Sequence, residues 1–346
     1  MARPIDTGNR RVNEQGDWPR TADGVAPAHV LERFSDNPSA FLALNVENEL
    51  FTASGIDGFI CYRGIGRSWI QFGGAFADRD QQRELLERFR FSAKKARRRL
   101  LAVQLQHADA QVYTEAGWSV NQLGASYAVE LEQMKLRGKK FVRLRNKISR
   151  ARRAGLQVSE VSADEHADAI ATIDRSWLSG KGSHVKELEF LVGEIGGPYQ
   201  PLRRFFLGTI DDRPIGYISY SPVYGQRPGW LHDLTRRVSD APPGVMETIN
   251  VDACQKFKKD GATWLHFGFT PFTGLNEEHE MPSARRSMSL FVHGLAKYGD
   301  KIYPARSQLD YKLKWEPTVI LPEYIAFPGR PSLRSVVNLF RVTNSI

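Results

Sequence analysis

Residues 138–156, GKKFVRLRNKISRARRAGL, are the sequence feature that most constrains the fold. Four apolar residues recur there at the spacing of one stripe on an α-helix: Phe141, Leu144, Ile148 and Ala151. Most of the other positions are Lys or Arg. A helix with a single apolar stripe is stable when this stripe packs on a core, and packing holds the cationic side chains outward. The segment therefore predicts a docked helix with a positive ridge.

The charge of this region is one-sided. Residues 135–153 contain ten Lys or Arg and no Asp or Glu, whereas the whole chain has 48 basic and 39 acidic residues and a net charge of +9. A helix that is merely soluble usually mixes its charges and gains i,i+4 pairs. We interpret the ridge as a surface for a polyanion such as nucleic acid. A solvated face, or a contact with an acidic protein, is the alternative.

Length and composition exclude several classes of protein. The 346 residues suffice for two domains of ordinary size. The chain has two cysteines, Cys61 and Cys254, and no Cys/His cluster at metal-ligand spacing. No apolar run approaches the ~18 residues of a membrane-spanning helix, and no secretory signal begins the chain. We expect a cytoplasmic protein without a disulfide framework or a metal.

The first half of the chain reads as strands followed by alternating helices and strands, which predicts an α/β (α+β layered) unit at 27–134. Residues 1–26 are polar and lack periodicity, so we expect a disordered tail. Strands are predicted at 41–45, 58–63, 68–72, 100–105 and 127–132, a helix from Gly73-Gly74 to about residue 99, and a helix at 108–116.

The second unit, 135–346, begins with the basic helix. The predicted order is then a helix at 164–178, strands at 204–210, 214–220 and 229–236, a helix from Val245 with Gly261 as its C-cap, a strand at 262–269 and a helix at about 284–297. The segment PSLRSVVNLFRV near the end predicts an amphipathic helix that docks on the protein, with a membrane anchor as the alternative. This order resembles that of a GNAT-type acyltransferase domain.

The turn before the predicted helix at Val245 bears on the acyl donor. In GNAT-type domains the N-terminus of this helix receives phosphate groups of the donor, and coenzyme A users usually have a Gly-rich turn there. This chain has Ala241-Pro242-Pro243-Gly244. Two prolines remove two backbone donors, which disfavours coenzyme A.

Seven blocks, in order, carry a more specific resemblance: GKKFVRLRNKISRARRAGL, RSWLSGKG, RFFLGTIDDRPIGYISYSP, LHDLTRRVSDAPPGVME, FGFTPFTGL, YGDKIYP and YKLKWEP. Between about residues 38 and 330 the chain resembles the catalytic domain of aminoacyl-phosphatidylglycerol synthases, a tandem of two GNAT-like units. The block DLTRRVSDAPPGVME is the most specific, because it resembles the family pattern DLMRR-x-x-x-APxGVME.

This resemblance implies a donor, an acceptor and a location. The donor is an aminoacyl-tRNA, used as a co-substrate without a further cofactor. The acceptor is a lipid such as phosphatidylglycerol, or a small molecule as in the soluble members of antibiotic pathways. The family usually has a membrane domain ahead of the catalytic domain, and this chain shows none. We therefore expect a cytoplasmic enzyme, with peripheral contact at the inner membrane face as a further expectation.

An aminoacyl ester is already activated, so the protein needs to position two substrates and move one proton. Asp233 and Arg236 are the first candidates: Asp233 would bind the ammonium group or accept the proton, and Arg236 would hold a phosphate or carbonyl oxygen. Residues at i and i+3 on a strand share a site when the strand ends or bulges near Thr235. A buried Asp-Arg ion pair is the alternative.

The resemblance implies further site residues. Glu247 would act in the site, or cap its helix as a first-turn carboxylate. Lys314 would stabilise the leaving ribose oxygen, with a surface lysine as the alternative, and Lys312 is expected to point the same way in an alternating run. His232 should face away from Asp233 and pack. Lys181 lies in a Gly-rich loop that suits a contact with phosphate or a lid over the site, and a substrate contact is also predicted for Asp300, which stands where the family has Glu.

The basic helix is expected to lie beside the strand exit at Asp233 and to hold the tRNA backbone. The candidate contacts are Lys139, Lys140, Arg143, Lys147, Arg150 and Arg153. Two other functions remain open at this point. One is a coenzyme A-dependent N-acetyltransferase of the same fold, and the other is a non-catalytic RNA-binding module.

Overall fold

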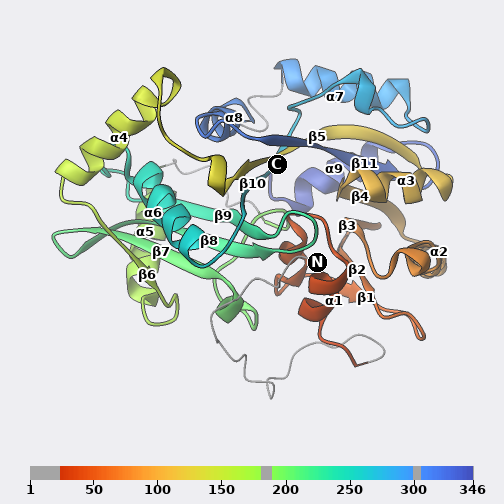
Figure 1. Cartoon of the computed structure of the whole chain (residues 1–346). Coiled ribbons are helices and arrows are strands. Elements are labelled where there is room, and N and C mark those ends of the chain that lie inside the picture. Colours follow the sequence, from red (N-terminus) through yellow and green to blue (C-terminus); the bar gives the residue numbers. More distant parts are fainter. Residues whose placement is uncertain (1–23, 181–188, 299–304, 346) are drawn as a thin grey trace.

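The computed structural model describes residues 24–180, 189–298 and 305–345. Within these residues, strands form one sheet of eleven in the order β1-β2-β3-β4-β11-β5-β10-β9-β8-β7-β6 (Figure 1). The strands are β1 (Glu49–Phe51), β2 (Phe59–Ile65), β3 (Ser68–Phe76), β4 (Arg99–Leu105), β5 (Ser119–Glu130), β6 (Gln157–Val161), β7 (Arg204–Ile210), β8 (Arg213–Val223), β9 (Gly229–Arg237), β10 (Trp264–Pro271) and β11 (Val319–Phe327). The α-helices are α1 (Pro27–Phe34), α2 (Arg79–Lys95), α3 (His107–Glu115), α4 (Val142–Arg153), α5 (Ala167–Ser179), α6 (Val245–Lys259), α7 (Arg286–Tyr298), α8 (Ala305–Leu313) and α9 (Leu333–Val342). Short 3-10 helices are η1 (Ala40–Leu44), η2 (Leu131–Gln133), η3 (Lys139–Phe141), η4 (Gln200–Leu202) and η5 (Glu277–His279).

The same arrangement of strands occurs twice. In the first half, β1, β2 and β3 are antiparallel neighbours and β4 runs parallel to β3. In the second half, β6 to β9 are antiparallel neighbours and β10 runs parallel to β9. An antiparallel meander that ends in a parallel pair is the strand pattern expected of each GNAT-like unit. The predicted fold class, a tandem of two such units with layered α and β structure, is confirmed.

The two halves are interlocked at the centre of the sheet. β11, from late in the chain, lies between β4 and β5, while β5, from the first half, pairs with β10 of the second. Each half therefore completes the sheet of the other. The domain boundary after residue 134 stays a prediction, because the sheet is continuous across it.

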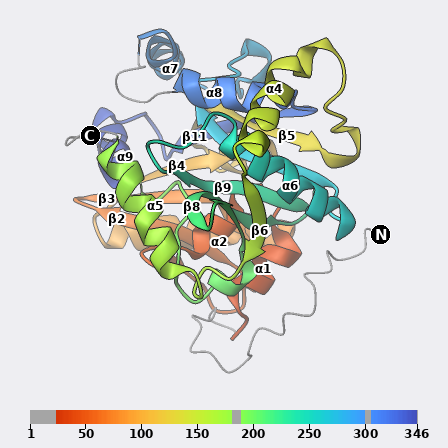
Figure 2. The same cartoon turned by 90° about the vertical axis from the view of Figure 1, so that its left-hand side faces the viewer.

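Side-chain alternation separates the two faces of this sheet. In β4, Leu100 and Ala102 belong to the core under α2 and α3, whereas Leu101 and Val103 belong to the core with α1, η1 and α9. In the second half, α5 and α6 pack on opposite faces of β8 and β9 (Figure 2). Successive residues of β9 therefore meet different helices.

The basic segment folds as predicted and docks through its apolar stripe. Leu144, Ile148 and Ala151 of α4 are buried, and α4 packs against α6. The approach is close at Gly244, which has a φ of 96° and where an added Cβ would lie 2.0 Å from the carbonyl oxygen of Lys147. Gly244 is thus needed both for its left-handed backbone and for the contact between the two helices.

Three predicted elements of the first half are wrong in type or extent. Residues 41–45 fall in the 3-10 helix η1, whose five residues are all buried; a short apolar run does not distinguish a buried turn from a strand. Gly73 and Gly74 continue β3, and the helix begins at Arg79 after the N-cap Asp78. β5 begins at Ser119, eight residues earlier than predicted, because its polar residues are buried on both faces.

The alternating run around Lys312 is also not a strand. Lys312 lies in the last turn of α8 and Lys314 follows the helix, so the two lysines do not point the same way. The C-terminal amphipathic helix, α9, docks on the protein as predicted, with Val336, Leu339 and Val342 buried. Across the described ranges, the structure contains no helix with both the length and the apolar character of a membrane span.

Candidate active site

The candidate site lies where two parallel strands separate. β9 and β10 pair over only three residues, from Gly229 to Leu231 on β9. Beyond this point a pocket of about 360 Å³ lies between His232, Asp233 and Thr235 of β9 and the β10 segment that starts at Phe267. The pocket therefore lies within the sheet, in the gap where β9 and β10 diverge.

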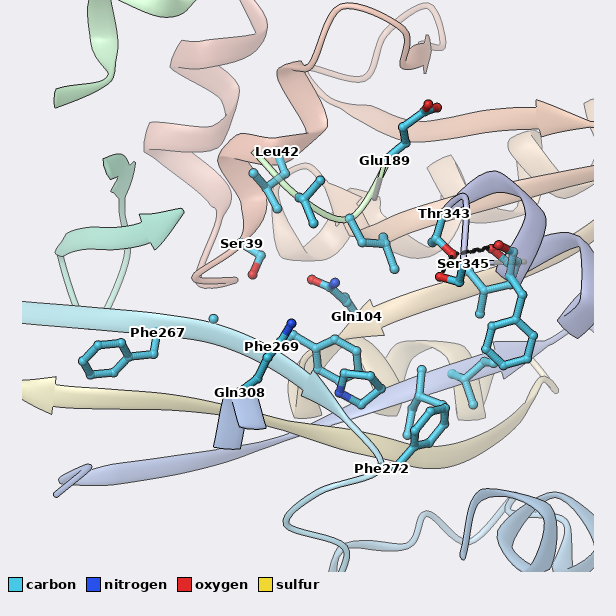
Figure 3. Close-up of a pocket in the computed structure, with 18 of the residues that line it drawn as sticks. Ser39, Leu42, Gln104, Glu189, Phe267, Phe269, Phe272, Gln308, Thr343 and Ser345 are labelled. Atoms are coloured by element: carbon cyan, nitrogen blue, oxygen red, sulfur yellow. Dashed lines mark hydrogen bonds between the residues drawn. The ribbon is translucent and has the colours of Figure 1, made fainter. Parts of the chain in front are cut away.

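The two ends of the pocket differ in chemistry. At one end, β9 and α8 supply polar side chains; at the other, α7 and α9 supply mostly apolar ones, beside the hydroxyl groups of Thr343 and Ser345. Figure 3 shows Gln308 and Phe267 at the first end and Phe272 with Thr343 and Ser345 at the second. The polar residues that β9 and α8 supply include His232, Asp233, Thr235, Gln308, Tyr311 and Lys312, and the apolar residues at the other end include Phe272, Met288, Phe291, Leu295, Val336, Leu339 and Phe340.

Lys312 is the buried cation of the polar end. Its Nζ donates to the carbonyl oxygens of Gly268 (2.7 Å) and Phe269 (2.9 Å), at the bulge in β10. Burial lowers the pKa of Lys312 to about 7, while the carboxylate of Glu323 favours the charged form. Two N–H groups of the amine donate to these carbonyls. The third position is free to donate to a ligand when Lys312 is charged, or to accept a proton when it is neutral.

Asp233 is partly buried and lies on the opposite side of β9 from His232. It accepts a hydrogen bond from Ser221 Oγ (2.5 Å) and one from the backbone N–H of Gly193. Burial raises the pKa of Asp233, and the charge of Arg203 and these two donors oppose that rise. Gly193 leaves room for this contact, since a Cβ there would lie 2.2 Å from the carboxylate.

Arg203, which the sequence did not single out, ties Asp233 to the first half of the chain. Its side chain is 1% exposed, donates to Asn45 Oδ1 at 3.0 Å and lies 3.7 Å from Glu194. Glu194 in turn accepts from the backbone of Val46. The N-terminal half thus positions the charge beside Asp233.

Arg236 lies on the same face as Asp233 but has another partner. The pairing of β8 with β9 shifts register between Ile218 and Tyr220, whose partners are Thr235 and His232, so β9 bulges where a site shared by Asp233 and Arg236 would require it. Arg236 pairs with Asp174 of α5 at 3.0 Å and lies 4.8 Å over Trp177. It is not among the described residues that line the pocket. Its predicted contact with substrate stays a prediction.

His232 faces away from Asp233, as its position on the strand predicts. It packs edge-on against Tyr220 and beside Phe267, and lies 3.4 Å from the hydroxyl of Tyr311. Burial and the charge of Lys312 lower the pKa of His232 to about 3. The imidazole is therefore neutral near pH 7 and forms part of the pocket wall.

Glu247 joins two of the predicted lysines. Its side chain is 8% exposed and its Oε1 lies 3.1 Å from Lys147 Nζ and 3.4 Å from Lys314 Nζ. Burial raises the pKa of Glu247, but the two ammonium groups lower it more, so the carboxylate is ionised. Lys314 also lies 5.3 Å over the ring of Tyr311, which lines the pocket. A series of contacts therefore connects α4 with the pocket.

The remaining cations of the basic segment are on its surface. Lys139, Arg143, Arg150 and Arg153 are exposed, and Lys140 pairs with Glu316 at 3.2 Å. Among the described residues, no carboxylate pairs with Arg143, Arg150 or Arg153. Lys181 and Asp300 lie outside the described residues.

Comparison with known proteins decides the family. The family model "Phosphatidylglycerol lysyltransferase, C-terminal" matches residues 28–327. The chain belongs to this family. A phosphatidylglycerol lysyltransferase of Bacillus subtilis is 22% identical to this chain over 330 aligned residues, which cover 94% of this chain and 37% of that protein. A bifunctional lysylphosphatidylglycerol biosynthesis protein, LysX, of Mycolicibacterium vanbaalenii is 27% identical over 239 residues, 66% of this chain and 21% of that protein. The chain thus spans well under half of these relatives.

Solved structures of the family share the fold. The C-terminal domain of a putative lysylphosphatidylglycerol synthetase from Agrobacterium fabrum superposes with a TM-score of 0.73 at 22% sequence identity. The match covers 92% of this chain and 94% of that domain's chain. L-PGS from Bacillus licheniformis also has a TM-score of 0.73, at 20% identity, and covers 91% and 95%. The fold of the family is therefore present over nearly the whole chain.

Proposed function

We propose that this chain transfers an amino acid from an aminoacyl-tRNA to a hydroxyl group of a polar lipid, phosphatidylglycerol or a close analogue. The observation that carries the proposal is the pocket with two unlike ends. Its polar end holds Lys312 and Asp233 and is connected to α4, while its apolar end is formed by α7 and α9. A polar donor and a lipid acceptor would each find a matching environment. The names of the relatives, which are phosphatidylglycerol lysyltransferases, support the acceptor.

The donor is inferred from α4. Cations that are held outward without paired carboxylates match the phosphates of a nucleic acid backbone. Lys147 and Glu247 join the ridge to the residues around Tyr311. A tRNA acceptor stem on this ridge would bring its esterified end toward the pocket.

The residues of the polar end suffice for the chemistry. The acceptor oxygen attacks the ester carbonyl carbon, the bond from that carbon to the ribose oxygen breaks, and the ribose leaves as an alcohol. Lys312 takes the proton from the acceptor hydroxyl and returns it to the ribose oxygen, which its pKa of about 7 allows at neutral pH. Asp233 binds the ammonium group of the amino acid through a charge-assisted hydrogen bond. Arg236 is assigned to holding β9 on α5 through Asp174.

A coenzyme A donor fits less well. The N-terminus of α6, where the pyrophosphate of coenzyme A would bind in this fold, is covered by α4 at Gly244. Glu247 also already places a carboxylate in the first turn of α6, where a donor phosphate would otherwise bind.

The test is transfer of label from charged tRNA to lipid. Purified protein is incubated with each of a full set of radiolabelled aminoacyl-tRNAs and vesicles that contain phosphatidylglycerol, and the lipid extract is counted. We expect lipid-bound label from a small number of the tRNAs. Deacylation that depends on a small soluble acceptor instead, or labelled product from acetyl-coenzyme A alone, would reject the proposal.

A further inference from the structure

Helix α9 has two apolar sides. The inner side is part of the pocket, through Val336, Leu339 and Phe340. On the outer side Leu333 is 71% exposed and Val337 is 39% exposed. These two residues are four positions apart, so they lie next to each other on the helix surface. Single exposed aliphatic residues are common, but here a pair lies on the helix that closes the apolar end of the pocket.

The charged residues of α9 itself and of the segment just before it are all positive. Arg330, Arg334 and Arg341 are exposed, and the sequence contains no Asp or Glu after Glu323. In the described ranges, none of the three arginines has a carboxylate partner. We define the α9 outer face as Arg330, Leu333, Arg334, Val337 and Arg341.

A second group of cations adjoins this face. Asn338 of α9 donates to Ser68 Oγ at 3.0 Å, which places the helix against the turn that contains Arg67. Arg98 donates to the carbonyl of Gly66 in the same turn. Arg67, Arg97 and Arg98 are exposed, so the positive surface extends from α9 to the ends of β3 and β4.

We propose that the α9 outer face binds the anionic surface of a phospholipid bilayer. Aliphatic side chains among arginines, on a short amphipathic helix, match the interface between head groups and acyl chains. A surface for single-stranded RNA would instead present aromatic side chains for stacking. The proposal rests on the proposed function, because a docked α9 would bring the apolar end of the pocket to the membrane that holds the acceptor.

Flotation with vesicles of phosphatidylglycerol and phosphatidylcholine, without tRNA, tests the contact. Each cation near an anionic surface contributes roughly fivefold to partitioning. We expect Arg334→Glu with Arg341→Glu to weaken binding at least about 25-fold, and Leu333→Ser with Val337→Ser to weaken it about tenfold. The matched control is Ile320→Ser on β11, which is 50% exposed and pairs with Tyr127 in the centre of the sheet, outside the α9 outer face; its binding should equal that of the wild type.

Three outcomes would overturn the proposal. The α9 variants could bind vesicles as the wild type does, the Ile320 control could lose as much binding as they do, or the arginine variant could lose tRNA binding and keep vesicle binding. The last result would assign this face to RNA.

A second readout separates this contact from the transferase activity. Transfer is measured with phosphatidylglycerol in vesicles and with a short-chain form that is monomeric in solution. We expect Leu333→Ser with Val337→Ser to lower transfer to vesicles about tenfold and to leave transfer to the monomeric lipid unchanged. If the variant transferred to vesicles and to the monomeric lipid at the wild-type rates, the result would contradict the docking proposal and leave the proposed function intact. No transfer by the wild type on either form would contradict the proposed function, while flotation still reports on α9.

Discussion

Lys147 of α4 donates a 3.1 Å hydrogen bond to Glu247 of α6, so the basic helix is joined to the first turn of the helix that follows β9. Lys314 reaches the same carboxylate oxygen at 3.4 Å and lies over Tyr311. The surface proposed for tRNA and the pocket proposed for chemistry therefore share one ion-pair cluster. Loss of Glu247 should affect both stability and donor use.

Glu247→Gln should lower the free energy of unfolding by about 1 kcal/mol at pH 7, because it removes a nearly buried charge from two lysines, one of which is half exposed. The pKa of Glu247 is lowered from its ordinary value of 4.5. A lowered carboxylate pKa gives stability that is present above the unfolded value and lost as pH falls through the folded value. Denaturant titrations should thus show the difference from wild type at pH 7 and its decrease below about pH 4.5.

The matched control for this change is Glu316→Gln. Glu316 pairs with Lys140, and both side chains are about half exposed, so the change should cost less than about 0.5 kcal/mol. A cost as large as that of Glu247→Gln, or no dependence on pH, would show that the cluster has no special role.

Lys312→Met should lower the transfer rate at least about 100-fold, because it removes the proposed proton acceptor and keeps a similar volume. In the wild type the rate should rise with pH and reach half its plateau near pH 7, since the neutral amine accepts the proton. Lys312→Arg stays charged at every accessible pH and should be as inactive as the Met variant. Transfer is followed by single-turnover kinetics between pH 5.5 and 9.

The control for Lys312 is Lys140→Met, at an exposed lysine outside the pocket. It should keep the same dependence of the rate on pH. An active Lys312→Arg variant would show that the amine binds charge and does not move a proton.

Most elements of the second half could be predicted from the sequence because their periodicity is strong; β6 was not predicted, and α8 was predicted as an alternating run. β7 begins and ends where the apolar run of 204–210 does, and α6 ends next to Gly261. The interlocking of β5 and β11 could not be predicted, since strand order depends on contacts between distant segments. Residues 41–45 show the same limit, because burial on all sides removes the periodicity that distinguishes a helical turn from a strand.

The candidate site was predicted in part. The motif around Asp233 and Glu247 pointed to the strand exit beside the pocket, but the partners of these carboxylates come from elsewhere in the chain. Arg203 lies in an ordinary basic pair before β7 and carries no signal in the sequence. Glu323 could have been noticed in the sequence, because it is a lone carboxylate in the otherwise apolar strand β11. Lys312 was assigned to a strand, and its direction follows from the last turn of α8.

Asp233→Asn should reduce transfer about 10- to 100-fold, the effect of a lost charge-assisted contact with the ammonium group. The discriminating measurement compares an aminoacyl-tRNA with the same tRNA carrying the N-acetylated amino acid. The wild type should prefer the free ammonium by about the same factor, and the variant should use both donors equally. Ser221→Ala removes one hydrogen bond to Asp233 and retains the charge, so the preference should persist. A variant that still prefers the free ammonium would exclude Asp233 from amino acid recognition.

Arg143→Ala and Arg150→Ala should each weaken tRNA binding and lower the slope of log K against log salt concentration by about one, because each removes one phosphate contact. Both side chains are exposed on α4. Single-turnover transfer at saturating aminoacyl-tRNA should stay at the wild-type rate, since neither residue lies in the pocket. Filter binding from 50 to about 300 mM salt measures the slope. Arg83→Ala, at an exposed cation of α2, is the control and should leave the slope unchanged. If Arg83→Ala lowered the slope as much, tRNA would bind through the net charge of the protein, and α4 would not be a specific binding surface.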